Sequence, residues 1–124
     1  LSMQFEGIGN VELVPFVPEE KLRFLMGQAD VSLNSMDDTV GSNVIVTSMA
    51  MGLAMICSNV GSIGDYCGED NAIFCDNADP TSFTIAIRQL RSNPKKLLSM
   101  RKASRRRAEQ FSIESFHDWL CNNL

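Results

Sequence analysis

Residues 37–58 read DDTVGSNVIVTSMAMGLAMICS, and this stretch decides the fold. A polar loop that contains Gly41 leads into the apolar run 43–51, which predicts a short helix that ends at Gly52. The compact apolar run 53–57 follows and predicts a buried strand. Because helix N-termini carry unpaired N–H groups and partial positive charge, small residues before such a helix let a phosphate come close. The stretch therefore predicts a segment that is able to hold a nucleotide diphosphate.

Short strands and helices alternate along the rest of the chain. Strands are predicted at 11–14 and 71–75, a helix end followed by a strand at 29–33, and one helical turn at 63–66. The longer helices are predicted to begin at Pro18, Asp79, Lys95 and Ser112. The side chains expected to face the core from these helices are Leu22, Leu25, Met26, Phe83, Ile87, Leu90, Leu97, Leu98 and Met100. This alternation indicates an α/β fold with a parallel sheet, whose ligands bind in the loops that follow the strands.

The composition of the 124-residue chain is that of a globular protein, and we expect one domain over residues 1–124. A net charge of −4 argues against binding to nucleic acid, which needs clustered Lys and Arg. No apolar run approaches the roughly 20 residues of a membrane span and no signal peptide is visible, so we expect a cytoplasmic location. Since the sequence starts at Leu1 rather than Met, we expect a fragment or a processed chain.

The cysteines indicate reduced, mostly buried thiols rather than a metal site. Cys57, Cys67, Cys75 and Cys121 show no C-x-x-C spacing. His117 is the only histidine, so the ligands that zinc requires are lacking. We therefore expect neither a metal nor another cofactor.

Six short motifs occur together in a characteristic order and spacing. They are PEEKL at 18–22, ADV at 29–31, SNVI at 42–45, MAMG at 49–52, VGS at 60–62 and FS at 111–112. Together they resemble the donor-binding, C-terminal half of retaining glycosyltransferases with the GT-B fold (glycosyl transferases group 1, family 4-like). The resemblance implies a Rossmann-like parallel sheet with flanking helices, which is half of a GT-B fold and is truncated here.

The resemblance also implies an activity. Enzymes of this family transfer a sugar from a nucleotide-sugar donor to a glycan or lipid-linked acceptor and keep the anomeric configuration. The family's first two strands, with an Arg and a Lys that grip the diphosphate, and its N-terminal acceptor domain lie upstream of this sequence. We therefore expect this chain alone to catalyse no transfer. A metal is not needed, because the helix dipole and basic residues can neutralise the diphosphate.

The signature glutamates of the family are replaced in this sequence. In the family, two glutamates eight residues apart hold the donor sugar and the ribose, and Thr39 and Thr47 stand in their places here. A threonine offers one uncharged hydroxyl, although Asp37 or Asp38 could replace the first glutamate. The substrate-binding residues that the resemblance implies are Asp37, Asp38, Thr39, Gly41, Ser42, Asn43, Val44, Thr47, Val17, Lys21 and Asp65.

Structural alternatives stand beside these functional interpretations. Ser42 or Asn43 would equally cap a helix in a plain loop, and Asp65 would fit an ordinary polar turn. For the whole protein, the alternative is a catalytically degenerate GT-B-like domain that acts as a scaffold or partner subunit, which the loss of both glutamates favours. The basic residues between Arg101 and Arg107 are interpreted as a solvated helix face, with peripheral contact to the inner face of a membrane as the alternative.

Overall fold

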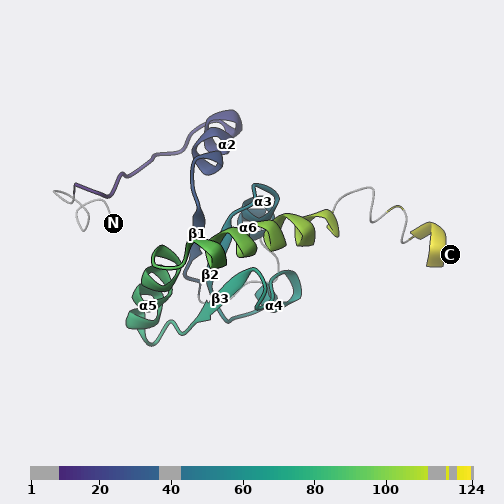
Figure 1. The fold of residues 1–124 in the computed structure, drawn as a ribbon. Helices are drawn as coiled ribbons and strands as arrows, with labels where there is room; N and C mark the ends of the chain where they lie inside the picture. The colour runs from purple at the N-terminus through teal and green to yellow at the C-terminus, as the bar shows by residue number, and fades with distance from the viewer. Residues whose placement is uncertain (1–8, 37–42, 112–116, 118–119, 124) are drawn as a thin grey trace.

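The computed structural model describes residues 9–36, 43–111, 117 and 120–123, and the side chain of Asn43 is not among the described parts. In chain order the elements are α2 (Glu19–Gly27), β1 (Val31–Asn34), α3 (Asn43–Ala50), β2 (Ala54–Ser58), α4 (Ile63–Tyr66), β3 (Ala72–Cys75), α5 (Pro80–Arg91) and α6 (Pro94–Glu109) (Figure 1). Residues 120–123 are helical as well, whereas the predicted start of that helix at Ser112 lies outside the described residues.

The three strands form one parallel sheet in the order β1-β2-β3. In the register, Val31 pairs with Ala54, and Met55 pairs with Ala72. Every residue of the central strand β2 is buried, as expected for a parallel strand that is covered on both faces. The predicted α/β fold, a Rossmann-like parallel sheet with flanking helices, is therefore confirmed.

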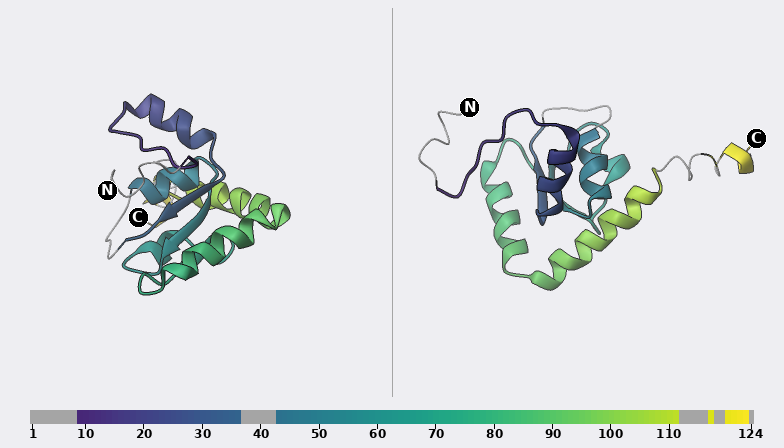
Figure 2. Two further views of the ribbon diagram at one scale, coloured as in Figure 1. Left: turned by 90° about the vertical axis from the view of Figure 1, so that its left-hand side faces the viewer. Right: turned by 90° about the horizontal axis from the view of Figure 1, so that it is seen from above.

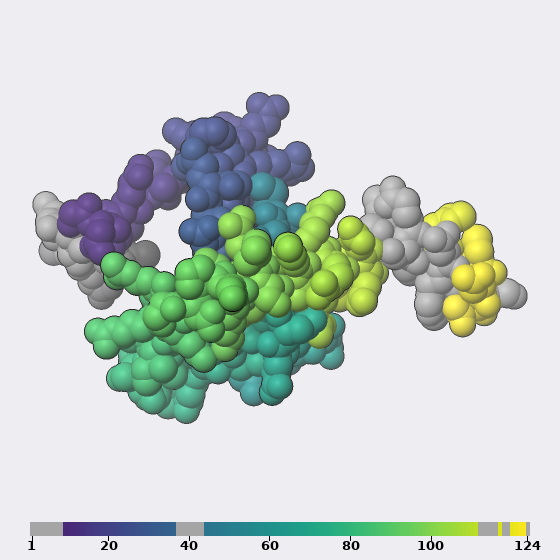
Figure 3. All heavy atoms as spheres, viewed as in Figure 1, coloured from purple at the N-terminus to yellow at the C-terminus, as the bar shows by residue number. Residues whose placement is uncertain are grey.

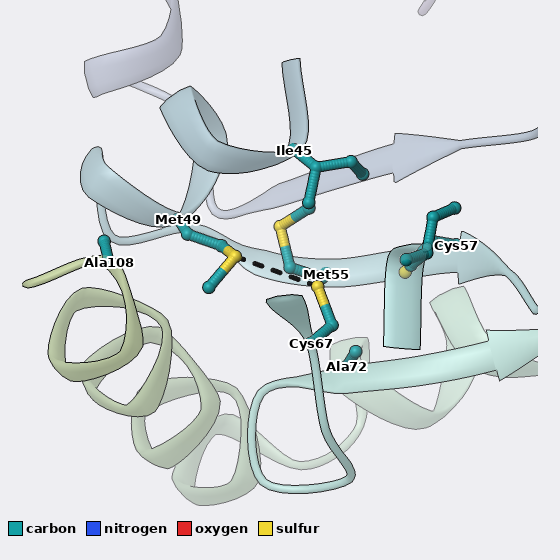
Figure 4. Packing of buried hydrophobic residues seen from close by; sticks show 8 residues of the cluster. Ile45, Met49, Met55, Cys57, Cys67, Ala72 and Ala108 are labelled. Atoms are coloured by element: carbon teal, nitrogen blue, oxygen red, sulfur yellow. Dashed lines mark hydrogen bonds between the residues drawn. The ribbon is translucent and has the colours of Figure 1, made fainter. Parts of the chain in front are cut away.

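Helices cover both faces of the sheet (Figure 2). Because successive side chains of a strand point to opposite faces, alternate residues of β2 contribute to two separate cores. The first core, between the sheet and α3 and α4, is shown in Figure 4. It contains Ile45, Met49, Met55, Cys57, Ile63, Cys67, Ala72 and Ala108, whereas the second contains Ala54, Ile56, Cys75, Ala86, Leu90 and Met100.

Gly52 ends α3 as the sequence predicts. Its φ of 74° lies in the left-handed region, which a residue with a Cβ adopts only at a cost. The amide of Gly52 donates to the carbonyl of Met49 at 3.0 Å, and the amide of Leu53 donates to the carbonyl of Ser48 at 3.1 Å. These bonds satisfy the last carbonyls of the helix and turn the chain directly into β2.

Helix α6 lies across the amino ends of the strands. Its side chains contact the residues that directly precede them: Arg101 Nη1 donates to Asp30 before β1 at 2.8 Å, and Asn71 before β3 donates to Ser104 at 3.2 Å. Arg101 Nε also donates to the carbonyl of Gly52, before β2, at 2.9 Å. In Figure 3, α5 and α6, drawn in green, cover the face turned to the viewer. The carboxyl ends of the strands point away from this helix.

The arginines of α6 therefore do not form the free basic face that the sequence suggests. Arg105 Nη1 donates to the carbonyl of Ala50 at 2.7 Å, at the C-terminus of α3, where a cation is favoured by the helix dipole. Arg107 Nε donates to Asp70 Oδ1 at 2.7 Å. With Arg101, these side chains bind their own domain, although Arg105 is exposed like Lys102 and Arg106.

Four expectations about local structure are wrong. Residues 11–14 form no strand, and a strand without a neighbour has no partner for its backbone groups. Leu22, Ile87 and Leu98 do not face the core, since they are 45%, 46% and 53% exposed. In α5 the buried side chains are Ala86 and Leu90, one helical turn apart. Ile87 follows Ala86 directly and therefore points away from the core.

Candidate functional site

Polar side chains gather where the three strands end. Asn34 is the last residue of β1, Ser58 is the last residue of β2, and Asn77 follows β3 by two residues. In open parallel sheets, ligands bind at this carboxyl edge. Since α6 occupies the opposite edge, the carboxyl edge is the part of the sheet to examine for a site.

A hydrogen-bond network joins the three strand ends. Ser58 Oγ donates to Asn77 Oδ1 at 2.6 Å and accepts from the amide of Met36 at 2.9 Å. Asn77 Nδ2 donates in turn to the carbonyl of Met36, and Ser35 Oγ donates to Asn77 Oδ1 at 3.2 Å. Both backbone groups of Met36 are therefore held by side chains from the ends of the other two strands.

Helix α3 begins at the same edge. The chain leaves β1 at its carboxyl end and returns to the amino end of β2, so the N-terminus of the connecting helix lies beside the strand ends. The first turn of α3 carries no acidic residue. Ser48 Oγ lies 2.9 Å from Ser32 Oγ and fixes the helix against β1. The N-terminus of a helix carries partial positive charge and is a favourable place for an anion.

An apolar cleft of about 540 Å³ lies between α2, with the segment before it, and the unit formed by β1 and α3. Val17 and Val44, two of the predicted binding residues, line this cleft together with Leu25 of α2 and Leu33 of β1. The structure thus brings Val17 and Val44 together. An apolar slot of this size suits a flat ring better than a charged group.

Thr47 is exposed on α3, one turn beyond the start of the helix. It lines a smaller hollow of about 240 Å³ together with Leu22, Met26 and Val44. Thr47 and Val44 are therefore neighbours at one surface, and none of the described residues that line this hollow carries a carboxylate.

Some of the remaining predicted binding residues are described and lie away from the cleft, and the others lie outside the described residues. Lys21 on α2 and Asp65 on α4 are both exposed, and neither of them lines the cleft or the hollow. Tyr66, next to Asp65, packs edge-on against Phe111 with ring centroids 5.1 Å apart, so its ring serves the core. Asn43 starts α3. Asp37, Asp38, Thr39, Gly41 and Ser42 lie outside the described residues.

A polar hollow, whose residues were not among the predicted binding residues, lies at the carboxyl ends of β2 and β3. Its volume is about 420 Å³, and Asn59, Asp76 and Asn77 supply its polar groups. Asp76 Oδ1 accepts from the amide of Ala78 at 2.9 Å and shapes the turn after β3. The signal was available, because polar residues directly follow two predicted strands.

All four cysteine thiols are free, and Cys121 is the exposed one. The pKa of the Cys57 thiol is raised by the hydrogen bond of Cys57 with Cys67 and by burial. The same hydrogen bond lowers the pKa of Cys67. Burial raises the pKa of Cys75.

Across the described ranges, no three His, Cys, Asp or Glu side chains lie close enough together to hold a metal ion. Nor does any helix in that part of the chain combine the length and hydropathy needed to cross a bilayer.

The parallel sheet, the helices on both of its faces and the cleft beside its carboxyl edge define a Rossmann-like α/β domain. Residues 1–93, which are most of the 124-residue chain, match the family model described as glycosyl transferases group 1. The chain belongs to the group 1 glycosyl transferases. A comparison with curated proteins gives no match.

Proposed function

We propose that this chain is part of the donor-binding half of a glycosyltransferase that moves a sugar from a nucleotide-sugar to a glycan or lipid-linked acceptor, with retention of configuration. The observation that carries the proposal is the carboxyl edge of the sheet, where the acid-free N-terminus of α3 lies beside an apolar cleft. A diphosphate fits the helix terminus, and a nucleobase fits the cleft. The family match supports the same kind of ligand.

In this proposal the diphosphate contacts backbone amides from Gly41 to Val44, and Val17 lies against the base. Metal is not required, because the helix terminus itself supplies partial positive charge. The isolated chain is proposed to bind nucleotide without catalysing transfer. The membrane contact considered above gains no support, since Arg101, Arg105 and Arg107 bind their own domain.

The first test is a titration of UDP and GDP into ¹⁵N-labelled chain, without divalent metal and with EDTA present. We expect millimolar binding that shifts the amide signals of the α3 start and of residues that line the cleft, such as Val44 and Leu33. Uridine and guanosine without phosphate serve as controls and should bind more weakly. Absence of shifts at these amides for both nucleotides would remove the support for donor binding by this chain.

The second test replaces Thr47 by glutamate. A carboxylate accepts charge-assisted hydrogen bonds from ribose hydroxyls, worth roughly 1.5–3 kcal/mol against about 1 kcal/mol for a neutral bond. Thr47→Glu is therefore expected to tighten nucleotide binding several-fold in calorimetry, and the position is exposed, so the larger side chain fits. Thr47→Gln, which has the same shape without charge, is the matched control. Equal affinities for wild type and Thr47→Glu would mean that this position does not face the ribose.

A second function, that of a catalytically degenerate domain acting as a scaffold or partner subunit, is favoured by one observation. Among the described residues, the hollow around Thr47 is lined by apolar side chains and the threonine itself, and none of these carries a carboxylate. If neither nucleotide binds, and Thr47→Glu does not create binding, this second function becomes the better account of the chain.

A further inference from the structure

We infer that Asn77 is a positioning residue, which acts with Ser58 to fix the end of β1 at the carboxyl edge where the donor is proposed to bind. The inference rests on the proposed function for the ligand, but the clamp itself is a property of the domain. Here the clamp means the side chains of Asn77 and Ser58 together with the backbone of Met36.

The geometry assigns each atom of the Asn77 amide a role. The carbonyl oxygen of Met36 can only accept a hydrogen bond, so the nitrogen Nδ2 of Asn77 must face it as donor. The opposite oxygen, Oδ1, is then left to accept from the hydroxyls of Ser58, at 2.6 Å, and Ser35, at 3.2 Å. One amide therefore ties the turn after β3 to both other strand ends.

Ser58 completes the clamp from the central strand. Its side chain is fully buried, so its hydroxyl needs partners inside the protein. It accepts from the amide of Met36 at 2.9 Å while it donates to Asn77. The amide and the carbonyl of Met36 are thus both fixed, and its side chain packs against the first core.

The position of Met36 gives the clamp a functional consequence. β1 ends at Asn34, and α3 begins at Asn43, so Met36 is close in sequence to both the strand end and the proposed phosphate-binding helix terminus. No hydrogen bond of a sheet ladder holds Met36, because it lies beyond the pairing of β1 with β2. The clamp replaces that ladder and sets where the chain leaves the sheet.

The test uses the full chain with the variants Asn77→Ala and Ser58→Ala, and Asn122→Ala, an exposed asparagine remote from the sheet, as the matched control. Three quantities are measured: hydrogen exchange of the Met36 amide, affinity for UDP and GDP, and the melting temperature. Exchange needs no ligand, so the clamp can be tested even where no nucleotide binds.

We expect Asn77→Ala and Ser58→Ala to speed exchange of the Met36 amide about tenfold and to weaken nucleotide affinity about fivefold, while amides of β2 stay protected. The double variant should bind nucleotide no more weakly than the more severe single variant, because the two residues act as one unit. Unchanged exchange at Met36 would overturn the clamp. Faster exchange with wild-type affinity would overturn its role in positioning. Lack of nucleotide binding by the wild type would instead refute the proposed function, and exchange would still decide whether the clamp exists.

Discussion

Ile56→Ala is expected to lower the free energy of unfolding by about 3 to 4 kcal/mol, measured by urea denaturation followed by circular dichroism. Ile56 is 0% exposed at the middle of the central strand, where it packs in the second core with Ala86 and Leu90. Its loss removes buried apolar surface and leaves a cavity that strands on both sides hold open. A domain of ordinary stability, roughly 5 to 15 kcal/mol, would lose a large part of its margin.

The matched control is Ile85→Ala on α5. The same atoms are removed there, but Ile85 is 59% exposed, so the expected change is within about 0.5 kcal/mol. Equal effects of the two substitutions would contradict the burial that defines β2 as the central strand. A small effect at both positions would show that the second core does not stabilise the domain.

The unit that runs from α3 through Gly52 into β2 was predictable from the sequence, because its signals are local. A glycine ends the helix through its own backbone, and the apolar run after it is long enough for a buried strand. The segment 11–14, in which Glu12 interrupts the apolar residues, was also predicted as a strand but forms none. Pairing of a strand depends on a neighbour, and the local sequence does not contain that information.

The clamp at Met36 could be predicted only in part. The loops after the strands were expected to hold the site, which includes the positions of Ser58 and Asn77. The hydrogen bonds between these side chains depend on the relative positions of three strand ends. Met36 and Asn77 are 41 residues apart, so the local sequence does not predict their contact. The same reason explains why Arg101 and Arg105 were interpreted as a solvated face, although they bind residues 71 and 55 positions away.

Asn71→Ala is expected to cost about 2 to 3 kcal/mol of unfolding free energy, because it leaves a buried hydroxyl and a backbone amide without their partner. Asn71 and Ser104 are both fully buried. Asn71 Oδ1 accepts from the amide of Gly68 at 2.9 Å, and Nδ2 donates to Ser104 Oγ at 3.2 Å. Asn59→Ala, at an exposed asparagine, is the control and should change stability within about 0.5 kcal/mol in the same denaturation experiment.

The double variant Asn71→Ala with Ser104→Ala separates the lost bond from the orphaned hydroxyl. Once Ser104 is alanine, no buried hydroxyl remains to be left without a partner, so the double variant should cost about 1 kcal/mol less than the sum of the single variants. Strict additivity would mean that the Ser104 oxygen finds another donor, such as a water molecule, when Asn71 is removed. In that case the amino edge of the sheet would not depend on this hydrogen bond, and packing together with the ion pair between Arg107 and Asp70 would hold α6 against the start of β3.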